Sequence, residues 1–117
     1  MDTVLAKTKD LQRAAIRKVL ADYHRLNLRA DSELESVLIC DEESDNYLLL
    51  LMGWDGSVRV KTVQIHVRLK DDRLWIEEDW TEDGVVMDLI AAGVEKGAIV
   101  LGFLPLEGRE VAMGQLG

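Results

Sequence analysis

The sequence predicts one α+β domain: a long N-terminal helix packed on a four-stranded antiparallel meander, then a short helix and a short C-terminal strand. Two observations carry this prediction. Apolar residues repeat at steps of three and four over residues 4–27, and from residue 34 onward the period becomes that of extended strands. Short polar turns connect the later apolar runs. Such short connections are typical of an antiparallel meander and argue against a doubly wound nucleotide-binding sheet.

The first helix is expected over residues 4–27. Charged side chains such as Lys7 and Arg17 fall on the faces away from its apolar stripe, as in a helix that packs with one side on a sheet. Asn27 tolerates the conformation that ends a helix, and the period is lost after it. The stripe consists of Val4, Leu11, Ala15, Val19, Tyr23 and Leu26.

The first two strands are expected over residues 34–40 and 47–54, with a polar turn at residues 41–46. Residues 47–54 are almost uniformly apolar, which predicts a central strand that is buried on both faces. Asp55-Gly56 then predicts a tight hairpin, because glycine supplies the positive φ that such a turn needs.

The third and fourth strands are expected over residues 58–69 and 73–78. Apolar residues alternate in the second half of the third strand, but Val58 and Val60 alternate in the opposite phase. A β-bulge adds one unpaired residue to a strand and reverses its phase. We therefore expect a bulge near Lys61-Thr62.

A short helix and a short strand complete the predicted fold. Residues 79–82, Asp-Trp-Thr-Glu, have the form of a capping box, so a helix is expected to begin there. Gly93 is expected to end this helix. The apolar residues 98–103 are then expected to form a short buried strand.

The composition predicts one cytoplasmic domain that spans residues 1–117. The chain is 48% hydrophobic and 31% charged, and its length suffices for a single core. No apolar run is long enough to cross a membrane, and the N-terminus lacks the apolar block of a secretory signal. Cys40 is the only cysteine, so no internal disulfide can form, which fits a reducing compartment.

The net charge of −8 is unevenly distributed. Residues 1–29 carry a net charge of +4, so the remainder carries −12. An acidic body repels phosphate, which disfavours direct nucleic-acid binding. The basic side of the first helix has two interpretations: a solvated face, or a docking surface for an acidic partner or a DNA backbone.

The densest acidic cluster supports a catalytic hypothesis, a magnesium-dependent nuclease, because hard cations bind several carboxylate oxygens. Strand alternation, however, predicts that Glu77 and Glu78 point to opposite faces, and capping already explains Asp79 and Glu82. No lysine follows at the spacing of a restriction-type nuclease. We therefore predict no metal site in the cluster of Glu77, Glu78, Asp79, Glu82 and Asp83.

No other residues form a recognisable catalytic set. His24 and His66 lie far apart in the sequence, with no ligand cluster around either. Ser57 lies in a turn, Cys40 is expected to be buried, and neither has a base at a recognisable spacing. The glycines form no phosphate-binding motif. The sequence thus predicts no catalytic residue, no metal and no cofactor.

Three tryptophans, Trp54, Trp75 and Trp80, stand out in a chain that is only 5% aromatic. The simpler interpretation is that they pack in the core or at its edge. A solvent-exposed Trp75 or Trp80 beside acidic residues would instead mark a protein interface, because tryptophan is enriched there as an anchor.

The chain carries several short motifs in a fixed order: Gly53-Trp54-Asp55, Leu74-Trp75-Ile76, Asp79 with Thr81-Glu82 and Gly84, and Ile99-Val100-Leu101-Gly102-Phe103. In this order, over residues 5–110, they resemble the XisI family, the excision-controlling factors associated with the cyanobacterial fdxN element. The chain departs from the family after Phe103, where the family has a histidine and two prolines, although Arg109 matches an arginine of the family's tail.

The resemblance implies a small α+β protein that acts with a second factor, XisH, which looks like an endonuclease-fold protein. It also implies that the pair supports a site-specific recombinase in programmed DNA excision. A protein of this kind needs a surface for its partner. Motif positions and expected exposure select the candidate contact residues Trp54, Asp55, Trp80, Glu82 and Arg109.

The preferred hypothesis is therefore a non-catalytic accessory protein that binds a partner. The alternatives are a metal-dependent nuclease that uses the cluster from Glu77 to Asp83, and direct DNA binding through the basic N-terminal helix. A homodimer is a further expectation, because an open sheet edge invites pairing.

Overall fold

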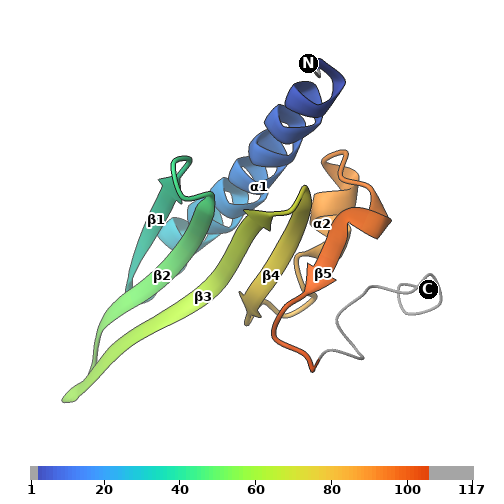
Figure 1. Cartoon of the computed structure of the whole chain (residues 1–117). Coiled ribbons are helices and arrows are strands. Elements are labelled where there is room, and N and C mark those ends of the chain that lie inside the picture. Colours follow the sequence, from blue (N-terminus) through green and yellow to red (C-terminus); the bar gives the residue numbers. More distant parts are fainter. Residues whose placement is uncertain (1–2, 106–117) are drawn as a thin grey trace.

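The structure, a computed structural model, describes the backbone of residues 3–105 and the side chains of residues 8–105. A long helix, α1, crosses one side of a five-stranded sheet, and a short helix, α2, lies beside it (Figure 1). The elements are α1 (Thr3–Arg29), β1 (Glu35–Asp41), β2 (Asn46–Asp55), β3 (Val58–Lys70), β4 (Arg73–Asp79), α2 (Val86–Ala91), a 3₁₀ turn (Lys96–Ala98) and β5 (Ile99–Leu101).

The strands follow one another across the sheet in chain order. Strands β1 to β4 form the antiparallel meander, and β5 adds a fifth strand parallel to β4. A parallel neighbour requires a crossover connection, which α2 provides. The predicted α+β fold is confirmed, and the expected helices and strands occur close to their expected places, apart from the later start of α2. No described helix is long and apolar enough to cross a membrane.

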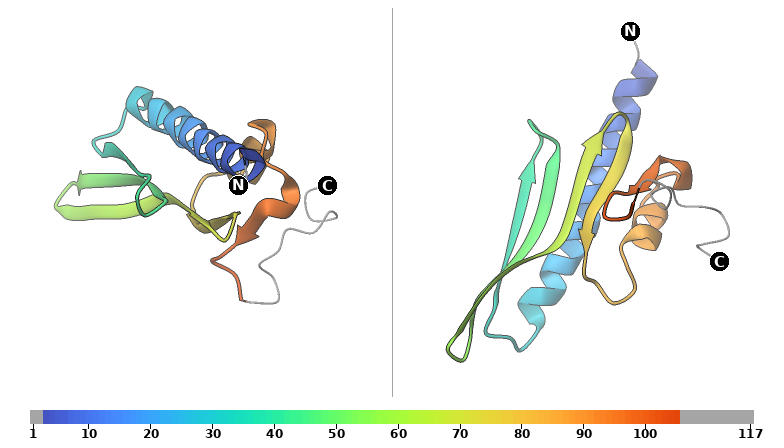
Figure 2. Two further views of the ribbon diagram at one scale, coloured as in Figure 1. Left: turned by 45° about the horizontal axis from the view of Figure 1, so that its top comes forward. Right: turned by 60° about the horizontal axis from the view of Figure 1, so that its bottom comes forward.

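Both helices lie on the same side of the sheet (Figure 2). Their apolar sides enclose the core together with every second residue of the strands. The resulting core contains Ala15, Ile16, Val19 and Leu20 of α1, Tyr47, Leu49, Ile65, Val67, Leu69, Leu74 and Ile76 of the meander, Val85, Leu89 and Val94 around α2, and Ile99 of β5. The predicted helix stripe is confirmed at Ala15 and Val19, whereas the side chain of Val4 lies outside the described residues.

Strand β2 is not buried on both faces, so that prediction is wrong. Tyr47 and Leu49 point toward α1 and are fully buried. Leu48 and Leu50 point away from the helices and are only half-buried. Within the described chain, the sheet has helices on one side alone, and the uniformly apolar sequence of β2 could not reveal this.

The β-bulge of β3 lies at Gln64, beyond the expected position at Lys61-Thr62. Leu50 pairs with Val63 and Leu49 with Ile65, so Gln64 is the extra residue. The side chain of Gln64 accepts a hydrogen bond from the Asn27 amide of α1 at 2.8 Å. The phase of the strand therefore changes at a contact with α1, which alternation within β3 did not disclose.

The predicted capping box does not start α2. The helix begins at Val86, and no side chain caps its first residues. Asp79 instead holds the preceding loop: one carboxylate oxygen accepts the Thr81 N–H at 3.0 Å and hydroxyl at 2.6 Å, and the other accepts the Val85 N–H at 2.7 Å. Gly93, with φ of +107°, follows the end of the helix as expected.

Candidate functional site

The side of the sheet that faces away from both helices carries a strip of aliphatic side chains. We call this side the uncovered face. Val37, Leu50 and Val63 are neighbours across β1, β2 and β3, and Ile39 and Leu48 are neighbours in the next row. These side chains are half-buried or, for Ile39, exposed, because the described chain lays no helix over them. The strip is thus an apolar surface without a cover in this part of the chain.

Trp54 lies near the C-terminal end of β2, and 54% of its surface is exposed. Alternation along β2 from Leu48 and Leu50 places the indole on the uncovered face. The guanidinium of Arg59, from the paired residue of β3, lies 5.6 Å from the centre of the ring. Such a cation–π contact holds an exposed ring in place without removing it from solvent.

Trp80 follows β4 and is the more exposed of the two, at 73%. Its backbone N–H donates to the Gln64 carbonyl at 2.9 Å, which extends the pairing of β4 with β3 by one residue. Its indole N–H donates to the Glu78 carboxylate at 2.9 Å, so the ring lies on the same face as Glu78. Because Glu78 pairs with His66 across the sheet, this is the uncovered face.

The uncovered face near β4 carries an ion pair and a hydrogen-bonded histidine. Arg68 forms an ion pair with Glu77 at 2.8 Å, and the Nε2 atom of His66 lies 2.9 Å from the Asn46 Oδ1 atom. Burial lowers the pKa of His66, with the nearby carboxylates of Glu77 and Glu78 acting in the opposite direction. The lowered pKa favours the neutral form of His66 at pH 7.

Glu77 and Glu78 lie on the same face, contrary to the prediction from alternation. His66 pairs with Glu78 and Val67 with Ile76, so Glu77 is the extra residue of a second bulge. The two carboxylates contact Arg68 and Trp80. Asp79 turns toward the loop that it holds, and residues 82 and 83 are exposed. Among the described residues, no group of three His, Cys, Asp or Glu side chains is arranged to hold a metal ion.

The basic residues of α1 mostly have acidic partners. Arg13 donates two hydrogen bonds to Asp45, at 2.9 and 3.1 Å, and Arg17 pairs with Glu42 at 2.9 Å. Lys18 and Arg25 both pair with Asp22 of the same helix. Four basic side chains of α1 are therefore paired with carboxylates in the fold, which reduces the positive charge that this part of the helix presents.

The structure brings Trp54 and Trp80 to the uncovered face. Asp55 is exposed at the β2–β3 hairpin, Glu82 is exposed in the loop before α2, and Arg109 lies outside the described residues. Sequence reasoning missed the aliphatic strip, because Leu48 and Leu50 were assigned to a strand buried on both faces. The sequence of β2 holds no signal for it, because an apolar strand face reads the same whether or not another element covers it.

Comparison with known proteins assigns a family to this fold. The model of the family described as XisI protein matches residues 5–113. The chain belongs to the XisI family. This confirms the resemblance that the short motifs indicated. A comparison with curated proteins finds no match.

Two solved structures from the family are similar to this one. One is the fdxN element excision controlling factor XisI from Anabaena variabilis, with a TM-score of 0.76 and 31% identity, covering 86% of this chain and 96% of that chain. The other is a XisI-like protein from Anabaena variabilis, with a TM-score of 0.75 and 30% identity, covering 90% of this chain and 92% of that chain. The fold on which the uncovered face lies is thus a family property.

Proposed function

We propose that this chain is a non-catalytic accessory protein in the control of DNA element excision, and that it binds an XisH-like protein through the uncovered face. Family membership and the similarity to an excision controlling factor support the excision role. The observation that carries the partner-binding role is the pair of exposed tryptophans, Trp54 and Trp80, on an aliphatic sheet face that no described helix covers.

The energetics favour burial of this face. Removing apolar surface from water contributes about 25 cal/mol per Å². The exposed parts of the two tryptophans and the aliphatic strip are apolar surface of this kind. Tryptophan is also the residue type that most often contributes a large part of the binding energy at protein interfaces. Arg68 and Glu77 already form an ion pair before a partner binds, which limits the cost of removing their charges from water.

The experiment is co-expression with an XisH-like protein from the same source, followed by affinity purification and mass determination. The wild-type chain is expected to form a stoichiometric complex. The double variant Trp54→Ala/Trp80→Ala is expected to weaken the complex by about 2 kcal/mol or more, about thirtyfold, because both anchors are lost.

The matched control is Leu11→Ala/Leu28→Ala, which removes two exposed apolar side chains from α1 instead. The control is expected to bind as the wild type does. Separate elution of the wild-type chain and its partner would contradict the proposed partner, and equal loss in both double variants would contradict the proposed face. Mass determination of the chain alone shows whether the chain forms a homodimer.

A further inference from the structure

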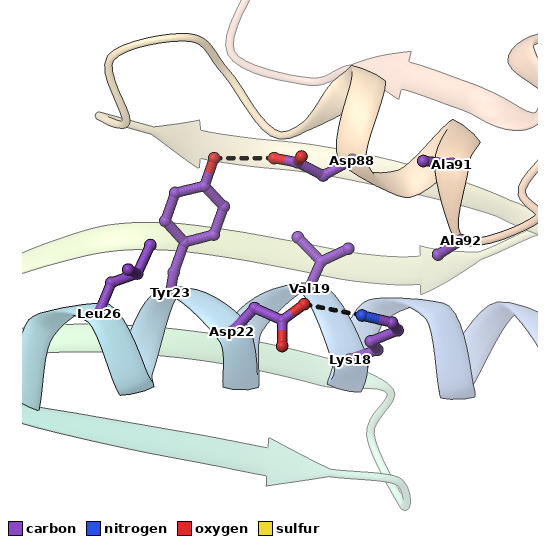
Figure 3. A pocket seen from close by; sticks show the side chains of 8 residues that line it. All are labelled: Lys18, Val19, Asp22, Tyr23, Leu26, Asp88, Ala91 and Ala92. Atoms are coloured by element: carbon purple, nitrogen blue, oxygen red, sulfur yellow. Dashed lines mark hydrogen bonds and ion pairs between the residues drawn. The ribbon is translucent and has the colours of Figure 1, made fainter.

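A groove of about 310 Å³ lies between α1 and α2, on the side of the sheet opposite to the uncovered face (Figure 3). The hydrogen bond from the Tyr23 hydroxyl to the Asp88 carboxylate, 2.8 Å long, joins its two walls. The groove is lined by Lys18, Val19, Asp22, Tyr23 and Leu26 of α1, and by Asp88, Ala91 and Ala92 at α2.

The apolar part of the groove is accessible. Val19, which is buried, forms part of the wall of the groove, and the small side chains of Ala91 and Ala92 leave space between the helices. Leu26, at one end, is 58% exposed, and Met87 of α2, outside the groove, is 55% exposed. Exposed aliphatic groups beside a hollow of this size suit a side chain as large as leucine.

The charges of the groove are not balanced. Asp22 is neutralised by Lys18 and Arg25, but Asp88 belongs to none of the ion pairs formed by the described residues. The pKa of Tyr23 is raised to about 12, first by burial and then by the hydrogen bond to Asp88, so its hydroxyl stays protonated and donates at neutral pH. Asp79 adds a second negative charge near that hydroxyl. The Tyr23 end of the groove is therefore electronegative.

We propose that this groove is a second docking site, which binds a helical segment of a partner protein that carries an arginine or lysine one turn from a leucine-sized side chain. The aliphatic side chain enters between Val19 and Ala91, and the cation binds Asp88. A carboxylate accepts several hydrogen bonds, so Asp88 can bind this cation while it still accepts from Tyr23. The chain's net charge of −8 attracts such a basic segment from a distance.

This site is independent of the uncovered face, because the two lie on opposite sides of the sheet. Substitutions in one are expected to leave binding at the other unchanged. A chain with both sites could hold two partners, or two parts of one partner, at the same time. The groove accommodates only a few side chains, so binding of an isolated segment is expected to be weak, at about micromolar to millimolar Kd.

The test uses the full chain and a synthetic helical peptide of about three to four turns, which carries leucines at i and i+4 beside arginines. A matched peptide has glutamate in place of each arginine. The arginine peptide is expected to bind and to shift backbone amide NMR signals of α2 and of α1 around Tyr23. The glutamate peptide is expected not to bind, because it meets Asp88 with like charge.

Asp88→Lys reverses the charge of the groove, and Glu43→Lys, in the β1–β2 turn, makes the same change in net charge elsewhere. Asp88→Lys is expected to weaken binding of the arginine peptide by about tenfold or more, and Glu43→Lys by much less. Asp88→Asn, which keeps an acceptor for Tyr23, guards against a loss that only reflects a disturbed helix contact, and it is also expected to weaken binding. Equal affinity of the two peptides, equal effects of Asp88→Lys and Glu43→Lys, or signals shifted only on the uncovered face would overturn the proposal.

Discussion

The two faces of the sheet consist of the same strands and similar residues, but they differ in how deeply their side chains are buried. On β2, Tyr47 and Leu49 are sealed under α1, whereas their neighbours Leu48 and Leu50 remain half-exposed. Alternation decides which residue belongs to which face, and the positions of the helices decide which face is closed. Burial of side chains on the covered face therefore stabilises the fold, whereas the uncovered face remains accessible to solvent.

The largest expected difference between the faces is in core truncation. Leu49→Ala is expected to lower the free energy of unfolding by about 2–5 kcal/mol, because it leaves a cavity among fully buried side chains. Leu48→Ala removes the same atoms from the adjacent position, and it is expected to cost about 1 kcal/mol or less, because solvent already reaches that side chain. Urea unfolding of both variants measures the comparison.

Binding should rank these two variants in the opposite order. Leu48→Ala is expected to weaken the complex with the XisH-like protein more than a folded Leu49→Ala does. Equal loss of stability in the two variants would mean that the face beneath Leu48 is closed, and it would remove the basis for a docking surface there.

A smaller effect is expected at the rim of the covered face. The guanidinium of Arg13 donates to Asp45, which also accepts the Tyr47 hydroxyl at 2.9 Å, and the hydrogen bond from Arg13 lowers the pKa of Asp45. Arg13→Gln is expected to cost about 1–2 kcal/mol at neutral pH, because the pair is partly buried.

This cost should depend on pH. A carboxyl whose pKa is lowered by folding stabilises the fold above its unfolded pKa, and that stability is lost as the pH falls through its folded pKa. The difference between the wild type and Arg13→Gln is therefore expected to shrink at acidic pH, below about 4. A difference that stays constant from neutral to acidic pH, in urea unfolding, would show that Arg13 acts through packing alone.

The smallest effect is expected at His66 on the uncovered face. Burial lowers its pKa, so between the lowered pKa and about 6.5 the unfolded chain binds more protons than the folded one. Stability therefore rises with pH through this window and is lost on acidification. His66→Gln is expected to lose less stability than the wild type between about pH 7 and about pH 5 in thermal unfolding. Identical pH profiles would mean that solvent reaches the ring freely.

The sequence by itself determined the elements and their order. The helical period of α1, the turn at Asp55-Gly56, the stop at Gly93 and the short apolar β5 are local features, and local steric and hydrogen-bonding preferences specify them. The family was also determined at this level, because its motifs are short stretches of sequence in a fixed order.

Only the tertiary structure decided which surfaces are closed. The sequence of β2 is apolar on both sides, and burial depends on whether another element lies over each side, which is not a local property. The bulges at Gln64 and Glu77 likewise follow from pairing between strands and from the contact with Asn27. The pairing of Arg13 with Asp45 and the groove between Tyr23 and Asp88 join residues far apart in the chain. Such sites arise from packing, because packing alone brings distant residues together.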